Sequence, residues 1–320
     1  MAILGLVTVL YNSDEMLDDF FRSLSIQTFT DYHLYIIDNS PSQATDDLLK
    51  DLSKKYAIPQ YTHFKNEGNY GVAKGNNQGT EMAIEAGSEY IILLNSDIEF
   101  TQPFLLEDLV NCAIQEKEEI IFPKVMFHGS RKIQVAGGKF IYYKGVSHGF
   151  GVNDDDGERY NKPGHFDYSP TCFMLFSKKV FDTIGYMDER YFVYGDDDDF
   201  VYRAIKQGFK LYFLPRLEIF HKSSFSTGGY ESLFSIYQIN RNRLYFIRKH
   251  FPFPLKQVAL AHAIITKSIR YVFFYDKDKR KSLLRAFKDG LFTMKIIKES
   301  KTPLHVPVKR TIEVNDAVEV

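Results

Sequence analysis

The sequence contains no tryptophan and only two cysteines, Cys112 and Cys172, among 320 residues. Two cysteines cannot build a disulfide scaffold, and they favour a reducing compartment. Long apolar runs are missing too, since stretches such as 258–261 and 271–275 fall far short of the ~18 residues that span a bilayer. Residues 1–7 lack the basic start and the cleavage site of a signal peptide, and they predict a first strand instead. We therefore expect a cytoplasmic protein.

Neither sign of charge dominates, because 40 Lys and Arg balance 41 Asp and Glu. With 44% apolar and 25% charged residues, the composition is that of a globular protein and excludes a largely disordered or collagen-like chain. The C-terminal part of the chain is basic, however, since residues 256–310 hold 14 Lys and Arg against 4 Asp and Glu. Such a basic segment suits a solvated helix face, a nucleic acid or an anionic membrane surface.

In the first hundred residues, short apolar runs alternate with amphipathic segments. They predict strands at 3–10, 33–37, 61–64 and 90–94, and helices at 16–24, 45–56 and 80–86. Strands that alternate with helices favour a parallel, doubly wound sheet. Ligands of such sheets bind beyond the carboxyl ends of the strands, which is where Asn12, Asp38 and Asp97 lie in the sequence.

The second half is less regular. Residues 129–164 are rich in Gly, Asp and Lys, with short aromatic strands such as 140–143, and we expect long loops there that order around a substrate. Further elements are predicted as strands at 173–176 and 210–213 and helices at 178–184, 200–207, 232–248, 255–275 and 281–298. A loose tail is expected after Pro303.

The triplet Asn95-Ser96-Asp97 ends an apolar strand. A carboxylate in this place can hold a divalent cation that bridges two phosphates, because hard cations prefer oxygen ligands. A simple turn at the strand end is the alternative. His221 follows a later strand, and neutral imidazole together with Asp97 would favour Mn²⁺ over Ca²⁺. A purely structural histidine is the alternative at that position.

Four adjacent carboxylates, Asp196–Asp199, directly precede the predicted helix 200–207 and lie between aromatic flanks. Burying several carboxylates together costs free energy unless a cation or a helix end neutralises them. In a pocket, one of them could act as a general base with a raised pKa. A solvated acidic helix start is the alternative.

The glycine-rich stretch 66–79 follows the third strand and not the first, so it does not fit a dinucleotide-binding fingerprint. Its glycines would still let backbone N–H groups approach a phosphate or a base. A flexible loop is the alternative.

Taken in order, these motifs resemble the family 2 inverting glycosyltransferases with the GT-A fold, most closely their bacterial rhamnosyltransferase-like and galactofuranosyltransferase-like branch. The resemblance covers residues 3–250 and rests on five segments, namely 7–12, 37–40, 66–79, 94–97 and 187–199. It implies an α/β fold with a Rossmann-like, mostly parallel central sheet and a C-terminal helical extension. We expect a catalytic domain at 1–228, with a nucleotide-binding half at 1–100 and an acceptor-side half at 101–228. A basic helical extension at 229–300 and a tail at 301–320 complete the expected organisation.

The same resemblance implies roles for individual residues. Asp38 would accept the N3–H of a uracil or thymine, and Asp97 and His221 would hold Mn²⁺ or Mg²⁺ on the diphosphate. Asp197 would be the catalytic base, although Asp196 stands where the family has Glu, which leaves the choice between the two open. Arg241-Asn242 resembles a later Arg-Asn pair of the family, which would lie near the diphosphate. The remaining donor contacts would come from Thr8, Tyr11, Asn12, Asn39, Gly71, Asn76, Asn95, Ser96 and Arg241.

The function implied is metal-dependent sugar transfer, with inversion, from a nucleoside diphosphate sugar to a saccharide acceptor in bacterial cell-surface polysaccharide synthesis. The expected donor is dTDP-rhamnose, with UDP-galactofuranose or another UDP-hexose as the alternative. A nucleotidyltransferase or a non-catalytic nucleotide-sugar binder would represent other classes. We expect no nucleic acid partner.

The basic C-terminal segment also shows apolar residues at helical spacing, namely Leu255, Val258, Ala259, His262, Ile265, Ile269, Leu283, Leu284, Phe287, Leu291 and Met294. An amphipathic, basic helix can lie in the interface of an anionic membrane. We therefore expect peripheral contact through residues 255–300 with the inner face of the cell membrane, where a lipid-linked acceptor would be found. Helices that cap the catalytic domain, or that form a homodimer, are the alternative.

Overall fold

The computed structural model describes residues 3–222, 229, 231–296 and 312–314. In the first part of the chain, four strands alternate with three helices, as predicted. The strands are β1 (Leu4–Leu10), β2 (Tyr32–Asp38), β3 (Tyr61–Lys65) and β4 (Tyr90–Leu94). The helices are α1 (Leu17–Ser25), α2 (Ala44–Lys55) and α3 (Val72–Glu85). All pairings among these four strands are parallel, in the order β4-β1-β2-β3.

The second part of the chain extends the same sheet with antiparallel as well as parallel pairs. It contains β5 (Ile98–Glu99), α4 (Leu105–Glu116), β6 (Ile120–Phe127), β7 (Ile133–Val135), β8 (Gly138–Ile141), β9 (Val146–Gly149), β10 (Gly164–Phe166), β11 (Phe173–Ser177), α5 (Lys178–Ile184), α6 (Asp196–Lys206) and β12 (Leu211–His221). Strand β11 lies between β4 and β6 and is antiparallel to both. Strands β8 and β9 form a separate hairpin.

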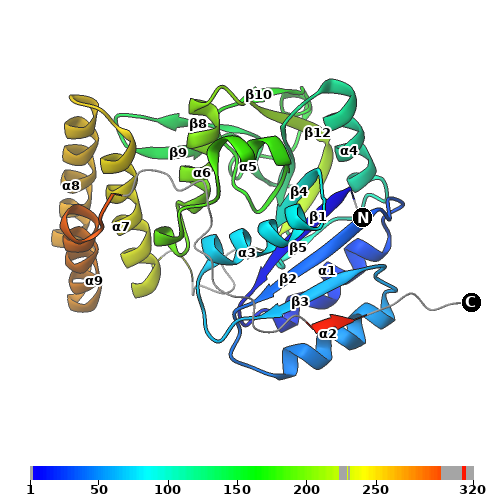
Figure 1. Ribbon diagram of the computed structural model, residues 1–320. Helices are drawn as coiled ribbons and strands as arrows, with labels where there is room; N and C mark the ends of the chain where they lie inside the picture. The colour runs from blue at the N-terminus through cyan, green and yellow to red at the C-terminus, as the bar shows by residue number, and fades with distance from the viewer. Residues whose placement is uncertain (1–2, 223–228, 230, 297–311, 315–320) are drawn as a thin grey trace, which may run out of the picture.

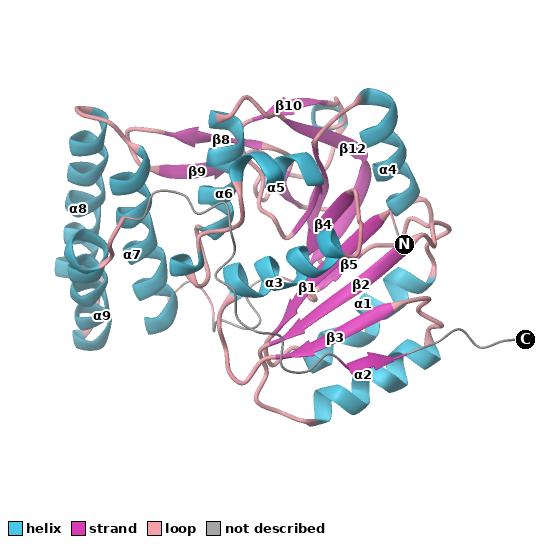
Figure 2. Cartoon of the chain, in the orientation of Figure 1, coloured by secondary structure: helices cyan, strands magenta, loops and turns pink. Residues whose placement is uncertain are grey.

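Two hydrophobic cores cover the two faces of the sheet. Helices α1, α2 and α4 pack on one face, with Phe20, Leu49 and Leu109 fully buried. Helices α3, α5 and α6 pack on the other, together with the C-terminal helices (Figure 1). The result is the layered α/β arrangement expected from the alternating pattern, with helices on both faces of the sheet (Figure 2).

Residues 72–79 of the glycine-rich stretch form the first part of helix α3, so this part is not the flexible loop that was the alternative. Gly75 faces Val9 on β1, and a Cβ atom at position 75 would lie 2.7 Å from the Val9 methyl groups. Gly79 faces Val7 on the same strand in the same way. These glycines therefore let the helix lie unusually close to the sheet.

Three C-terminal helices stand beside the sheet on the side of β8 and β9 (Figure 1). They are α7 (Leu233–His250), α8 (Leu255–Phe273) and α9 (Lys277–Lys288), followed by a π-helical turn at Asp289–Thr293. The last of them begins four residues earlier than predicted. Within the predicted tail, β13 (Ile312–Val314) pairs antiparallel with β3, while 301–311 and 315–320 lie outside the described residues.

Three further expectations need correction. Residues 129–164 are not simply long loops, because they include β7 and the β8–β9 hairpin. Strand β12 continues beyond Pro215 to His221, because an irregularity between Leu214 and Glu218 lets its pairing with β6 resume. Strand β6 itself was not predicted, since Pro123 and Lys124 interrupt its apolar pattern. Lys124 is buried, and its ammonium group donates to Asp156 at 2.8 Å.

Candidate active site

A cavity of about 300 Å³ lies beyond the carboxyl ends of β1 and β4. The start of α3, the segment before β11, the turn before α6 and the end of β12 also reach it. Ten predicted site residues line this cavity, namely Tyr11, Asn39, Gly71, Asn76, Asn95, Ser96, Asp97, Asp196, Asp197 and His221. The structure therefore brings together residues that lie more than two hundred positions apart in the sequence.

Four predicted residues do not line the cavity, namely Thr8, Asn12, Asp38 and Arg241. Thr8 is fully buried, and Asn12 adopts a left-handed backbone conformation and donates its backbone N–H to Ser40 Oγ at 3.0 Å. Asp38 is also fully buried, and both of its carboxylate oxygens are already bound. Its Oδ1 accepts the backbone N–H of Ser40 at 2.7 Å, and its Oδ2 accepts from the Lys65 ammonium group at 2.6 Å. Its neighbour Asn39 reaches the cavity in its place.

Asp97 and His221 form the candidate metal site. Asp97 Oδ1 is buried without a hydrogen-bond partner among the described residues, and it lies 3.1 Å from His221 Nε2. The other imidazole nitrogen, Nδ1, lies 3.1 Å from Gln134 Oε1. With the ring proton on Nδ1, the lone pair of Nε2 is available to a metal ion. Burial alone would raise the pKa of Asp97, but a proton on His221 Nε2, which donates to the carboxylate, outweighs burial and holds this pKa below its ordinary value.

An orphaned carboxylate oxygen beside an imidazole lone pair is a fitting pair of ligands for Mn²⁺ or Mg²⁺. The described residues hold two other groups of three candidate ligands, Asp38–Asp46–His63 and Asp19–Glu99–His128. Basic side chains already pair with both groups, since Lys65 contacts Asp38, and Arg22 contacts Asp19 and Glu99. The Asp97–His221 pair is therefore the better candidate for a metal.

The four carboxylates Asp196–Asp199 do not precede a helix but form the first turn of α6, and they face different surroundings. Asp196 and Asp197 line the cavity. Asp197 Oδ2 accepts a hydrogen bond from the Tyr168 hydroxyl at 3.1 Å. Burial raises the pKa of Asp197, while that hydrogen bond and the backbone N–H groups of the helix start oppose the rise. Burial and the charge of Asp197 raise the pKa of Asp196 well above its ordinary value.

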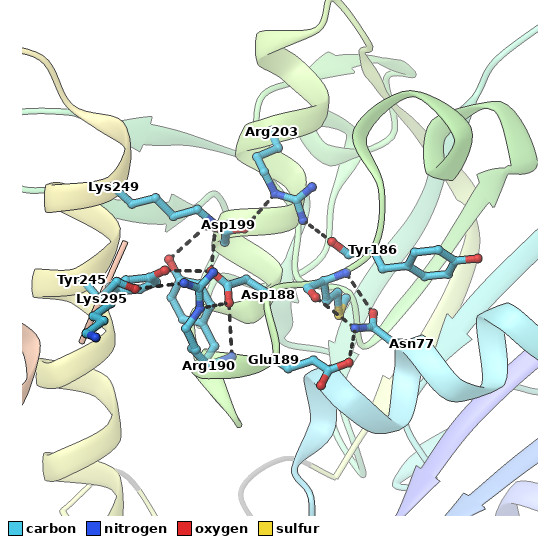
Figure 3. A network of polar contacts seen from close by, with 12 residues as sticks. Asn77, Tyr186, Asp188, Glu189, Arg190, Asp199, Arg203, Tyr245, Lys249 and Lys295 are labelled. Atoms are coloured by element: carbon cyan, nitrogen blue, oxygen red, sulfur yellow. Dashed lines mark hydrogen bonds and ion pairs between the residues drawn. The ribbon is translucent and has the colours of Figure 1, made fainter. Parts of the chain in front are cut away.

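Asp199 has a structural environment instead. It is fully buried, and it contacts Arg203 at 2.8 Å, Lys249 at 2.7 Å and His250 at 2.7 Å. Burial opposes its ionisation, but these cations outweigh burial and hold the pKa of Asp199 well below its ordinary value. The network continues through Lys249 to Asp188, and so ties α6 and the turn before it to α7 (Figure 3).

The turn before α6 has a strained backbone. Phe192 and Tyr194 both have φ near +66°, a conformation that side-chain-bearing residues rarely adopt. The Phe192 carbonyl accepts the N–H of Val72 at 2.6 Å at the start of α3. Gly71 is required at that contact, because a Cβ atom there would collide with the Phe192 carbonyl. The strained turn thus joins the start of α3 to the start of α6 at the cavity.

Asn242 on α7 holds this turn. Its Nδ2 donates to the carbonyls of Tyr191, Val193 and Tyr194 at 3.0, 2.9 and 2.6 Å. Arg241 donates to the carbonyls of Arg190 and Tyr191. The Arg-Asn pair, which the resemblance implied to lie near a diphosphate, therefore binds the turn and does not line the cavity.

Several cavity residues escaped the sequence analysis. Gln134 comes from the segment 129–164, Thr171 precedes the predicted strand 173–176, and Phe192 and Tyr194 were treated as aromatic flanks. Tyr168, the partner of Asp197, had no local signal at all. The contacts of Asn242 show the same limit, since only the fold brings this residue to a turn about 50 positions earlier.

The geometry now allows comparison with known proteins. Residues 6–185 match the family described as Glycosyl transferase family 2, and that match spans more than half of the chain. The chain belongs to glycosyl transferase family 2. This membership confirms the resemblance drawn from the motifs and favours a glycosyltransferase over a nucleotidyltransferase.

This family 2 glycosyltransferase is similar to two curated relatives. It is 24% identical over 246 residues to the low-salt glycan biosynthesis hexosyltransferase Agl10 of Haloferax volcanii, covering 75% of this chain and 74% of the relative. It is 23% identical over 198 residues to the dTDP-rhamnosyl transferase RfbF of Shigella flexneri, covering 59% of each chain. Both relatives are named as sugar transferases, which agrees with the glycosyltransferase predicted from the motifs.

Solved structures agree on the fold. The structure of GalNAc-T7 with UDP, GalNAc and Mn²⁺ matches with a TM-score of 0.62 at 14% identity, covering 90% of this chain and 56% of that one. At this identity the match concerns the fold alone. It confirms the predicted GT-A fold with a C-terminal helical part.

Proposed function

We propose that this family 2 glycosyltransferase transfers a sugar, with inversion at the anomeric carbon, from a nucleoside diphosphate sugar to a saccharide acceptor, with residues 1–228 as its catalytic domain. The observation that carries the proposal is that one cavity holds both the Asp97–His221 pair and a hydrogen-bonded carboxylate, Asp197, whose pKa is raised. An inverting transfer needs a charge-stabilising site and a base, and no covalent nucleophile.

Asp197 is the proposed base. It removes the proton from the acceptor hydroxyl as that oxygen attacks the anomeric carbon, and the raised pKa suits a base that must accept a proton near neutral pH. Tyr168 holds the carboxylate in place through its hydroxyl. Asp196 is the alternative base, because it lines the same cavity.

Asp97 and His221 are the proposed ligands of Mn²⁺ or Mg²⁺, supported by the orphaned Asp97 Oδ1 and by the Mn²⁺ in the structure of GalNAc-T7. A divalent ion in this place would take up negative charge on the leaving diphosphate. Gln134 fixes the imidazole tautomer through Nδ1. Asn95 lies beside the pair, with Nδ2 at 3.4 Å from His221 Nε2.

The proposed donor contacts follow the cavity wall. Tyr11, Asn39, Asn76 and Ser96 would contact the nucleoside and diphosphate, since all four line the cavity. Asp38 would act from behind Asn39, as its carboxylate is already bound by Lys65 and Ser40.

The proposed donor is dTDP-rhamnose, on the strength of the similarity to RfbF. A UDP-hexose, including UDP-galactofuranose, is the alternative, supported by the similarity to a hexosyltransferase and by the UDP in the GalNAc-T7 structure. We propose that the acceptor is a saccharide of a bacterial surface polysaccharide carried on a lipid, and that the enzyme works at the inner face of the cell membrane.

A donor panel tests the function. Release of the nucleoside diphosphate is measured with Mn²⁺ for dTDP-rhamnose, UDP-galactofuranose, UDP-glucose and UDP-N-acetylglucosamine, with and without a saccharide acceptor. We expect one donor to be turned over far faster than the rest. Turnover of none of a broadened panel, with no thermal stabilisation by any nucleotide sugar, would overturn the proposal.

A further inference from the structure

Helix α8 leaves several large apolar side chains exposed. Its inward face presents Ala259 and Ala263, both buried, and Leu255 and Leu260, which are partly buried against the same core. Its outward face presents Val258, Ile265 and Ile269, which are 51%, 60% and 50% exposed. A helix that only capped the catalytic domain would place its large apolar residues inward. The burial of Ala259 corrects the expectation that this residue belongs to the exposed apolar stripe.

The exposed residues form one continuous stripe, defined here as the α8 face. The stripe follows the helical spacing from Val258 through Ile265 and Ile269 to Val272, and Phe253 and Phe273 flank its two ends at 79% and 75% exposure. In Figure 1, α8 lies at the outer edge of the molecule, with α7 between it and the sheet. The 19-residue helix is about 28 Å long, so the stripe is an extended surface and not a single exposed side chain.

The β8–β9 turn extends the α8 face. Tyr143, 52% exposed, packs edge-to-face on His262 of α8 with ring centroids 5.8 Å apart. Arg243 of α7 anchors the same turn by donating to the Lys144 carbonyl at 2.6 Å. The Lys144 ammonium group lies over the Tyr143 ring, so an aromatic ring and a cation meet at this edge. Amphipathic groups of this kind suit a lipid headgroup region.

The charge around the face selects its partner. Residues 255–296, which include α8 and α9, hold ten Lys and Arg against three Asp and Glu, and Glu231 pairs with Arg270 and Lys279. A second copy of the chain would bring two such positive segments together, which is unfavourable, whereas an anionic lipid surface would neutralise them. No helix among the described residues is long and apolar enough to cross a membrane.

We infer that the α8 face lies in the interface of an anionic membrane, parallel to its surface, with the apolar stripe inserted and the basic residues among the headgroups. The partner is a bilayer that contains acidic phospholipids. The inference stands on this surface alone; only its use for a lipid-carried acceptor rests on the proposed function.

Vesicle co-sedimentation of the full chain tests the inference. Vesicles of phosphatidylcholine alone are compared with vesicles that also contain phosphatidylglycerol. We expect binding to the anionic vesicles that added salt reduces, and little binding to the neutral ones. Ile265→Asp should lower the partition coefficient about tenfold or more, because it places a carboxylate in the stripe.

Ile114→Asp is the matched control, because Ile114 is 50% exposed on α4, far from the face in sequence, and it should bind vesicles as the unaltered protein does. Melting temperature and donor hydrolysis are measured for both variants, so a failure of folding or of the proposed function is seen separately. Equal binding to both vesicle types, no binding to either, or a dimer in solution that Ile265→Asp dissociates would overturn the inference.

Discussion

Replacing Asn242 tests whether the strained turn places the catalytic carboxylates. Its side chain donates to three carbonyls of the 191–194 turn, and two residues of that turn have positive φ. In Asn242→Ala the carbonyls of Val193 and Tyr194 lose this donor, while the Tyr191 carbonyl keeps Arg241. A buried polar group without a partner costs about 1–3 kcal/mol. Each strained residue also holds about 1–3 kcal/mol that the turn can release by relaxing.

If the native conformation of the turn is destabilised by about 2 kcal/mol, its population relative to relaxed conformations falls roughly thirtyfold. We therefore expect kcat to fall about tenfold to a hundredfold in Asn242→Ala, while the global fold is retained. Asn242→Asp should be at least as severe, since it places a carboxylate oxygen against the same carbonyls.

Asn240→Ala is the matched control. Asn240 is equally buried on the same helix, but its Nδ2 donates to Ile236 four residues earlier in α7 and not to the turn. Steady-state turnover and thermal melting are measured for all three variants with the preferred donor. Normal kcat in Asn242→Ala, or an equal loss in Asn240→Ala, would refute the positioning role of Asn242.

Three more predictions follow. Tyr168→Phe removes a hydrogen bond that favours the ionised form of Asp197, so its pKa rises further and the acidic limb of the kcat/KM profile should move to higher pH; an unmoved limb would contradict Asp197 as the base. Chelation by EDTA should abolish transfer, Mn²⁺ or Mg²⁺ should restore it, and His221→Ala should need more metal for half-maximal rate; full activity in chelator would exclude the metal role. Because the pKa of Asp199 is depressed on folding, its stabilising effect is present at neutral pH and lost as the pH falls below the ordinary value of 3.8. Asp199→Asn should thus cost about 3–5 kcal/mol at pH 7, by denaturant unfolding, and less at pH 3; a constant difference would argue against the ion pairs.

The sequence predicts the nucleotide-side half of the fold well, because its strands and helices alternate and each carries its own periodicity. Four parallel strands and the positions of Asn95 and Asp97 at their carboxyl ends agree with that pattern. Strand β6 escapes the same reasoning, because Pro123 and Lys124 are tolerated only through an irregular pairing and a buried ion pair that local sequence does not reveal.

The candidate site, like the fold, is only partly predictable from the sequence. Asp97, Asp197 and His221 are visible as motifs, since their residue types suit metal binding and proton transfer. Tyr168 is not visible, because its role depends on a contact with a residue 29 positions away. Asn242 is visible as part of the Arg-Asn pair, but its contact with the turn about 50 positions earlier is not. The glycines of α3 are visible, but the sequence does not reveal that Gly75 and Gly79 pack against β1, since close packing and phosphate binding both favour the absence of a Cβ atom.

The most direct test of the account compares turnover and donor binding in Asp197→Asn, a substitution that keeps the shape of the side chain and removes its basicity. With the preferred nucleotide sugar and Mn²⁺, we predict that kcat falls by ~10² or more, the usual size of a general-base contribution. Donor affinity measured by calorimetry should stay near that of the unaltered enzyme. Asp196→Asn is measured beside it; loss of turnover in that variant alone would move the base by one residue, and normal turnover in both would contradict the mechanism.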